Sequence, residues 1–206
     1  MVPWGVADWG GDSRGVAEQL SSGVQTVVGN SSAFAAVKVD GSVVTWGWAE
    51  DGGDSLSVAE QLSSGVQTVV GSGYAFAAVK VDGSVVTWGF AGEGGDSRGV
   101  AEQLSSGVQT VVGNGRAFAA VKVDGSVVTW GHAEWGGGSR GVAEQLSTGV
   151  QTVVGNRDAF AAVKVDGSVV TWGQANNGGD SRGMAEQLSS GVQTVVGYGF
   201  AFAAVK

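Results

Sequence analysis

Short apolar runs recur along the chain and predict β-strands. The run from Val24 to Val28 alternates apolar and polar positions and is rich in β-branched side chains, as expected for a strand. Two more runs, Ala33 to Lys38 and Val43 to Trp46, flank the dipeptide Asp40-Gly41, which favours a two-residue hairpin turn. Both faces of this hairpin carry apolar side chains, so we expect the sheet to be covered on both sides.

A two-residue turn at Asp40-Gly41 would set the register of the hairpin. It would place Ala35 opposite Trp46 and Val37 opposite Val44. Because small alanines would then lie against large aromatic side chains, the pattern predicts sheets that stack closely.

The pattern repeats with a constant period of 42 residues. Each copy carries the dipeptide Trp-Gly, at Trp4, Trp46, Trp88, Trp130 and Trp172. A fixed period of this length indicates a solenoid, a propeller or an array. The sequence therefore predicts one mainly β domain over residues 1–206, a five-bladed β-propeller with repeats at about 1–42, 43–84, 85–126, 127–168 and 169–206.

The stretch between Asp12 and Gly23 is open to two interpretations. Ser13 could cap a short helix that holds Val16 and Leu20 and ends at Gly23. A short outer strand is the alternative. We favour a short helical turn in each blade.

The two ends of the chain are out of phase with the repeat. Met1 to Trp4 matches Val43 to Trp46, whereas Ala201 to Lys206 matches Ala33 to Lys38. In a closed ring the N-terminal strand would pair with the C-terminal strand and leave no long sheet edge exposed. We therefore expect a closed monomer. If this blade shape requires more blades, the chain would instead swap strands into an oligomer.

The amino-acid composition argues against several classes of function. The chain has 11 Lys and Arg against 19 Asp and Glu, a net charge of −8, which argues against nucleic acid or an anionic membrane as a partner. It has no Cys and one His, which excludes thiolate chemistry and multi-His metal sites. It shows neither a secretory signal nor an apolar run that could span a membrane, so we expect a soluble protein of unassigned compartment.

The segment from Gly29 to Gly47 resembles the RCC1-like propeller repeat. It contains a glycine, a short Ala-rich strand, Asp-Gly and then Val-Val-Thr-Trp-Gly, and Gly-Gly-Asp-Ser at 10–13 stands where that family has a Gly-Gln-Leu-Gly stretch. The resemblance extends over all five copies and implies a propeller fold. The family includes exchange factors for small GTPases, ubiquitin-ligase subunits and protein inhibitors of β-lactamase, but none of their functional residues can be matched here. The chain also departs from the family in having a shorter unit and fewer copies.

The nearly constant columns of the repeat offer residues for structure rather than for chemistry. The Asp of each Asp-Gly pair is explained by the turn, and Asp12 with its equivalents by helix capping. The Trp-Gly tryptophans are expected in the core. His132 has no Ser, Cys or metal-ligand partner that the sequence defines, and no phosphate-binding loop is present. We therefore expect no enzymatic activity, no metal and no cofactor.

Six columns differ in nearly every copy, while the other 36 are almost constant. They comprise positions 30 to 32, 48, 50 and 51 with their equivalents, thirty positions in all. The predicted hairpin brings both groups to one end of each blade, away from the Asp-Gly turn. The candidate ligand-binding residues at these positions are Val6, Asp8, Trp9, Trp48, Glu50, Asp51, Tyr74, Phe90, Glu93, Arg116, His132, Glu134, Trp135, Arg157, Asp158, Gln174, Asn176, Asn177, Tyr198 and Phe200.

The composition of the variable positions indicates binding. They hold seven aromatic residues, six acidic residues and two arginines, and adaptable binding surfaces combine aromatic side chains with Asn, Ser, Gly and Arg. Neutral drift would also have altered other exposed columns. The sequence therefore predicts a non-enzymatic binding propeller with a diversified face for a protein or glycan ligand, with a protein favoured. The alternatives are an engineered or highly repetitive symmetric propeller without a biological ligand, and a lectin.

Overall fold

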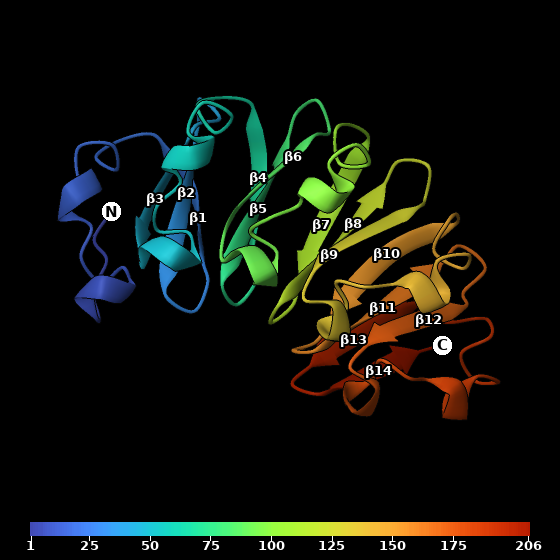
Figure 1. Ribbon diagram of the computed structural model, residues 1–206. Coiled ribbons are helices and arrows are strands. Elements are labelled where there is room, and N and C mark those ends of the chain that lie inside the picture. Colours follow the sequence, from blue (N-terminus) through green and yellow to red (C-terminus); the bar gives the residue numbers. More distant parts are fainter.

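The computed structural model describes residues 1–206 as a series of five β-sheets, which we call blades one to five (Figure 1). Blades one to four contain three antiparallel strands each, in chain order, and blade five contains two. The strands are β1 (Val24–Gly29), β2 (Ala33–Lys38), β3 (Val43–Gly47), β4 (Val66–Gly71), β5 (Ala75–Lys80), β6 (Val85–Gly89), β7 (Val108–Gly113), β8 (Ala117–Lys122), β9 (Val127–Gly131), β10 (Val150–Gly155), β11 (Ala159–Lys164), β12 (Val169–Gly173), β13 (Thr194–Tyr198) and β14 (Ala201–Val205). This bladed β architecture confirms the fold class that the repeat predicts.

Short 3₁₀ helices occupy the segments between the blades. They are η1 (Ala7–Trp9), η2 (Arg14–Val16), η3 (Ala49–Asp51), η4 (Leu56–Val58), η5 (Ala91–Glu93), η6 (Arg98–Val100), η7 (Ala133–Trp135), η8 (Arg140–Val142), η9 (Ala175–Asn177) and η10 (Arg182–Met184). Of these, η2, η4, η6, η8 and η10 confirm the short helical turn predicted for the stretch after Asp12, whereas the other five, which lie at the variable positions, were not predicted. The Ser13 side chain makes no capping bond, so its predicted capping role is wrong. Asp12 Oδ1 accepts a hydrogen bond from the Arg14 N–H at 2.9 Å, which agrees with the capping role predicted for Asp12. No helix has the length and apolar character needed to cross a membrane.

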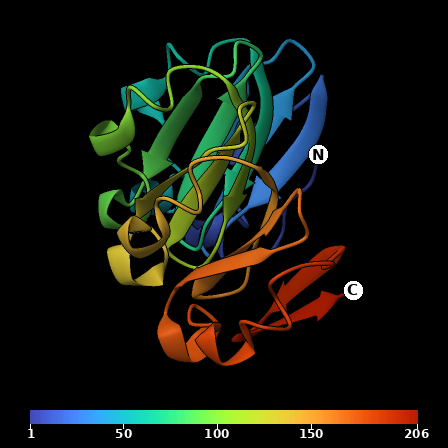
Figure 2. The same cartoon turned by 90° about the vertical axis from the view of Figure 1, so that its right-hand side faces the viewer.

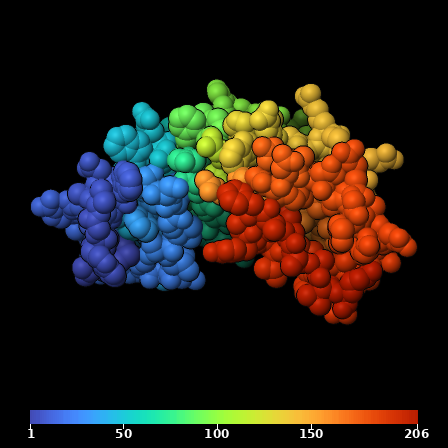
Figure 3. Space-filling model, turned by 90° about the horizontal axis from the view of Figure 1, so that it is seen from below, coloured from blue at the N-terminus to red at the C-terminus, as the bar shows by residue number.

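The blades follow one another along an open arc (Figures 1 and 2). The first strands of successive blades contact one another, β1 with β4, β4 with β7, β7 with β10 and β10 with β13. They therefore form the inner side of the arc, and the third strands form its outer side. The space-filling view shows the same succession of blades from blue to red (Figure 3).

The core lies between blades rather than inside any one of them. Between blades one and two, the small side chains Ala33 and Ala35 pack against Phe76 and Trp88 of the next blade, and Leu62 from the connecting segment closes the cluster. Equivalent clusters fill the next two interfaces. The small face of one blade thus receives the large face of the next, which confirms the close stacking that the sequence predicts.

The register of the hairpin differs from the prediction by one residue. Phe34 lies opposite Trp46, and Ala35 lies opposite Thr45. Because strand side chains alternate between faces, this shift moves Phe34 to the same face as Trp46. The two rings stack with centroids 5.3 Å apart, and Ala33 and Ala35 lie together on the other face.

The loop chemistry explains the shift in register. The Lys38 N–H donates to the Ser42 carbonyl at 2.9 Å, so that three residues, not two, lie between the paired positions. Asp40 Oδ1 accepts hydrogen bonds from the N–H and the hydroxyl of Ser42, and Gly41 adopts a φ of 76°. This is a type I turn followed by a glycine bulge, which Asp-Gly supports as well as it supports the two-residue turn.

The structure does not show the predicted closure of the ring. Met1 to Trp4 form no strand, and β14 pairs only with β13. Trp4 is 87 % exposed, whereas the equivalent Trp46 is 5 % exposed and donates its Nε1–H to the Gly10 carbonyl at 2.9 Å. The same interface recurs between neighbouring blades and sets the rotation from each blade to the next. With these rotations the two ends of the chain lie apart (Figure 1).

Candidate functional site

The variable positions lie at one end of every blade, and the Asp-Gly turns lie at the other end. In blade one, the Trp48 N–H donates to the Ser32 carbonyl at 2.9 Å, which joins the segment after the first strand to the segment after the third. The same bond recurs in the next three blades. We call this end the variable face, positions 30–32 with their equivalents the inner triplets, and positions 48, 50 and 51 with their equivalents the outer segments.

Backbone hydrogen bonds join the inner triplets of successive blades. The Ser31 N–H donates to the Gly73 carbonyl at 3.2 Å, and the Gly73 N–H donates to the Gly115 carbonyl at 3.1 Å. The series continues through Arg157 to Gly199 with bonds of 2.8 and 2.9 Å. Only backbone atoms take part, so the series forms with Ser31, Gly73, Gly115 and Arg157 at the middle position. The two glycines allow a close approach, because a Cβ atom on Gly73 would lie 2.3 Å from the Gly115 carbonyl oxygen.

In blades one, three and four, the first residue of the inner triplet is an asparagine that supports the blade. In blade three, Asn114 is buried, its Oδ1 accepts hydrogen bonds from the N–H groups of Arg116 and Ala117, and its Nδ2 donates to the Trp135 carbonyl at 2.6 Å. Asn30 and Asn156 make the same set of bonds in their blades. These asparagines hold the inner triplet against the outer segment.

The last residue of the inner triplet pairs with the last residue of the outer segment. The Ser32 hydroxyl donates to Asp51 Oδ2 in blade one, and Asn177 Nδ2 donates to Asp158 Oδ2 at 2.7 Å in blade four. In blade three the corresponding pair is Arg116 above the Trp135 ring. The sequence interpretation missed this coupling, although the two columns change to chemically matched residues within each of these three copies.

Arg116 also connects two blades. Its guanidinium carbon lies 4.4 Å from the centroid of the Trp135 ring and 5.8 Å from that of Tyr74, and its Nη1 donates to Glu93 Oε1 at 2.9 Å. Arg157 similarly lies over Phe200 of the next blade at 5.3 Å. A cation held by an aromatic face and a carboxylate is therefore already present on the variable face.

The structure divides the predicted binding residues by exposure. Glu93 and Asp158 are buried and cannot contact a ligand directly. Those that are partly buried are Asp51, Tyr74, Arg116, His132, Trp135, Gln174 and Asn177. The exposed ones are Val6, Asp8, Trp9, Trp48, Glu50, Phe90, Glu134, Arg157, Asn176, Tyr198 and Phe200.

Three buried side-chain atoms lack a hydrogen-bond partner, and all three belong to variable positions. They are Glu93 Oε2, His132 Nδ1 and Asp158 Oδ1. An unsatisfied buried polar atom costs roughly 1–3 kcal/mol. The variable face is therefore less well optimised for stability than the constant part of each repeat.

The constant acidic residues are engaged in local structure. A side-chain hydrogen bond from Arg14 lowers the pKa of Asp12 to about 2, and the equivalent pairs do the same for Asp96 and Asp180. Hydrogen bonds from Ser42 likewise lower the pKa of Asp40. A carboxyl group with a lowered pKa stays ionised at neutral pH, so none of these is suited to act as a general acid.

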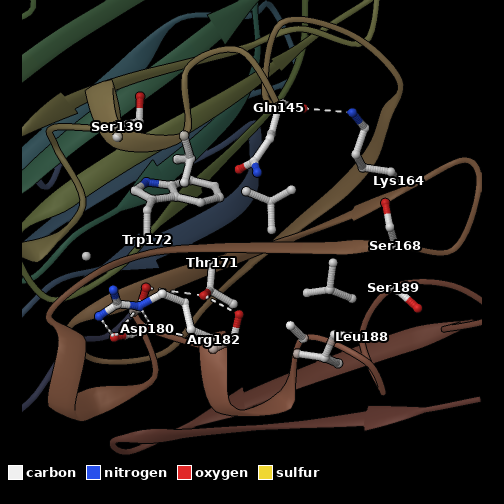
Figure 4. A pocket seen from close by; sticks show the side chains of 18 of the residues that line it. Ser139, Gln145, Lys164, Ser168, Thr171, Trp172, Asp180, Arg182, Leu188 and Ser189 are labelled. Atoms are coloured by element: carbon white, nitrogen blue, oxygen red, sulfur yellow. Dashed lines mark hydrogen bonds and ion pairs between the residues drawn. The ribbon is translucent and has the colours of Figure 1, made fainter.

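A polar cavity of about 680 Å³ lies between the connecting segments around blade four (Figure 4). Lys164, Ser168, Thr171 and the Asp180–Arg182 pair are among its lining residues. The Lys164 ammonium donates to the Gln145 carbonyl at 2.8 Å, and the Thr171 hydroxyl bonds to Ser181. A similar cavity lies one repeat earlier along the chain. Both are lined almost entirely by constant columns.

The variable face offers exposed surfaces for contact. The structure brings together no group of three carboxylate, imidazole or thiol side chains that could hold a metal ion. Several aromatic side chains of the variable face, among them Trp48 and Phe90, are about half exposed. Exposed aromatic side chains beside carboxylates are suited to bind a partner.

No protein-family model and no curated protein matches the sequence. Solved structures with a similar fold include human WBSCR16, at 17% identity and a TM-score of 0.54, where the match covers 88% of this chain and 57% of that one. Yeast RCC1 (Prp20), solved with Kap60 bound, has 12% identity and a TM-score of 0.57, with coverage of 94% and 56%. The CRINKLY WD40 ectodomain of the Arabidopsis thaliana receptor kinase ACR4 has 14% identity and a TM-score of 0.54, with coverage of 88% and 59%.

This similarity establishes the fold. It agrees with the resemblance of the repeat to the RCC1-like propellers, and the chain spans a little over half the length of each of these structures.

Proposed function

We propose that this chain, which has the fold of an RCC1-like propeller, is a non-enzymatic binding protein whose variable face contacts a macromolecular ligand. The observation that carries the proposal is the exposure of aromatic side chains at variable positions, whereas among the constant aromatic residues only Trp4 of the unpaired N-terminal segment is exposed. Trp48 is 45 % exposed and Phe90 is 48 % exposed, while the constant Phe and Trp residues of blade two are almost fully buried. Exposed aromatic groups reduce solubility and commonly mark interaction sites.

The unsatisfied buried atoms support the same proposal. Glu93, His132 and Asp158 each bury one polar atom without a hydrogen-bond partner, an arrangement that costs stability, and each occupies a column that differs between copies. Residues that reduce stability and differ between otherwise constant repeats are typical of a surface selected for recognition.

A protein fits this face better than a glycan does. The exposed aromatic side chains do not recur at the same position in each blade, and position 48 and its equivalents hold Val6, Trp48, Phe90, His132 and Gln174. A lectin with this symmetry would repeat its sugar-binding residues. A single extended protein surface can instead contact five different blade ends. Among the proteins of similar fold, Prp20p from Saccharomyces cerevisiae binds Gsp1p and histones, so the fold is compatible with protein partners.

The proposal can be tested with peptides selected from a random display library against the 206-residue chain. We call the tightest selected peptide the probe peptide. Trp48→Ala and Phe90→Ala should each weaken its binding by more than about 1 kcal/mol, as expected for interface anchors. Asp82→Asn and Asp124→Asn, at the opposite end of the blades, should leave the affinity unchanged. Equal affinity for the Trp48 and Phe90 variants and the parent would refute the proposal.

A further inference from the structure

The outer segments carry a row of largely exposed positions that no other part of the protein covers. This outer row consists of positions 48 and 50 with their equivalents, which are Val6, Asp8, Trp48, Glu50, Phe90, Gly92, His132, Glu134, Gln174 and Asn176. In blade one, Trp48 immediately precedes η3 and Glu50 lies within it. All five residues at position 50 and its equivalents are exposed.

The charged residues of the outer row are all acidic. It contains Asp8, Glu50 and Glu134 and no Lys or Arg. The other acidic residues of the variable face already have partners, because Asp51 accepts from Ser32, Glu93 from Arg116 and Asp158 from Asn177. Arg140 lines the same cavity as Glu134, but the two form no ion pair. Asp8, Glu50 and Glu134 are therefore the carboxylates that remain free for a partner.

The protein itself shows how such a surface holds a cation. Arg116 lies 4.4 Å from the centroid of the Trp135 ring while it bonds to Glu93 at 2.9 Å. A guanidinium thus binds where an aromatic face and a carboxylate occur together. The outer row offers the same two groups, Trp48 and Glu50, two residues apart and without an internal cation.

We infer that the partner of the variable face is a basic protein segment, in which arginine or lysine side chains lie over Trp48 and Phe90 and pair with Asp8, Glu50 and Glu134. This inference rests on the proposed function and adds the charge of its ligand. Aromatic side chains alone would suit a neutral partner equally well. The unpaired carboxylates of one sign exclude an acidic one, because like charges across an interface cost several kcal/mol.

Two matched variants separate this local effect from the overall charge. The first, D8N/E50Q/E134Q, removes three acidic charges from the outer row. The second, D40N/D82N/D124N, removes three from the Asp-Gly turns, where Asn also supports the turn. Both variants have the same net charge, so a difference between them reports the position of the charge.

The test measures the affinity of the probe peptide for the parent and both variants at low and physiological salt. We expect the selected peptides to carry net positive charge, the outer-row variant to bind at least tenfold more weakly, and the turn variant to bind like the parent. Neutral or acidic selected peptides, or equal binding by all three proteins, would overturn the inference. If Trp48→Ala still abolished binding in that case, the proposed function would stand without its basic partner. If Trp48→Ala also bound normally, both would fall.

Discussion

The tryptophan of the Trp-Gly pair occupies two different environments within one chain. In blade two, Trp88 is 2 % exposed, stacks on Phe76 and donates its Nε1–H to the Gly52 carbonyl at 3.0 Å. Trp4 has the same position in the repeat and is 87 % exposed. The residue type is the same, but Trp4 lies in a segment that pairs with no strand, so its ring lacks the packing that buries Trp88.

The two residues should respond differently to truncation. Trp88→Ala should lower the free energy of unfolding by about 3–5 kcal/mol, because it leaves a large cavity between two blades. Trp4→Ala should change it by less than about 0.5 kcal/mol, as for other surface positions. Urea unfolding of both variants measures the difference. A large loss of stability in Trp4→Ala would show that the first strand packs in the core, as a closed ring requires.

The constant Asp–Arg pairs should produce a defined dependence of stability on pH. Asp12, Asp96 and Asp180 have a pKa of about 2 in the folded protein, mainly through the hydrogen bonds from Arg14, Arg98 and Arg182. A pKa below the unfolded value of about 4 stabilises the fold above that pH, and the stabilisation is lost as the pH falls toward 2.

The triple variant D12N/D96N/D180N removes these three titrations. Its melting temperature should fall less steeply than that of the parent between pH 5 and pH 2. Thermal melts across this range provide the measurement, and low salt makes the effect larger because the pairs are exposed. Parallel pH profiles for the two proteins would contradict the assignment.

Among the structural elements, the hairpin loop determines which side chains enter the core. The loop between β5 and β6 repeats that of blade one, with Gly83 at a φ of 76°. A Cβ atom there would lie 2.8 Å from the Gly107 backbone nitrogen. The bulge therefore requires glycine for its conformation and for the close approach of the next blade.

Gly83→Ala should cost about 1–2 kcal/mol through the left-handed conformation alone. Gly99, in η6, is a matched control, because nothing lies within 4 Å of its added Cβ and its φ is not positive. Gly99→Ala should be neutral or stabilising by about 0.4–1 kcal/mol, since it restricts the unfolded chain. Chemical denaturation of the pair tests this, and equal stability of the two variants would show that the loop tolerates a side chain.

The same loop marks the limit of what the sequence could predict. The period, the strands and the helical turn follow from local pattern. The register does not, because Asp-Gly is compatible with loops of two or three residues, and the hydrogen bonds of Asp40 to Ser42 favour the longer one. Because the register is shifted by one residue, Phe34 lies on the same face of the sheet as Trp46 and not on the other face, as the two-residue turn predicts.

The sequence predicts where the variable face lies. It does not predict which of its residues pair with one another and which stay free for a ligand. The hairpin places both variable segments at the same end of the blade under either register. The predicted position of the variable face is therefore correct although the predicted register is not. The pairing of Asp158 with Asn177 and the contacts of Arg116 depend on side-chain geometry. These contacts show that part of the variation maintains the blade ends, and that the outer row is the part free to vary with a ligand.

At the scale of the whole molecule, constant and variable columns have separate roles. The constant columns build the interfaces between blades, each with a small face against a large one. Backbone bonds from Ser31 to Gly199 join the blade ends without using side chains. The arc can therefore present different residues on each blade while its packing stays the same. Closure by the terminal strands depends on the number of such interfaces, which is a property of packing angles and not of local pattern.

The central claim is that the residues of the variable face bind the ligand, while the constant columns of the repeat determine the fold. The most direct test gives the variable positions the residues of blade four, because its pairs Asn156–Asn177 and Asp158–Asn177 form within one blade. Gly73 and Gly115 are kept, because a Cβ atom there would lie 2.3 and 2.6 Å from a carbonyl oxygen of the next blade. We expect this uniform protein to unfold cooperatively, as the parent does, and to lose all binding of the probe peptide, as measured by calorimetry. Retained binding by the folded uniform protein would contradict the claim, because the ligand would then contact the constant columns.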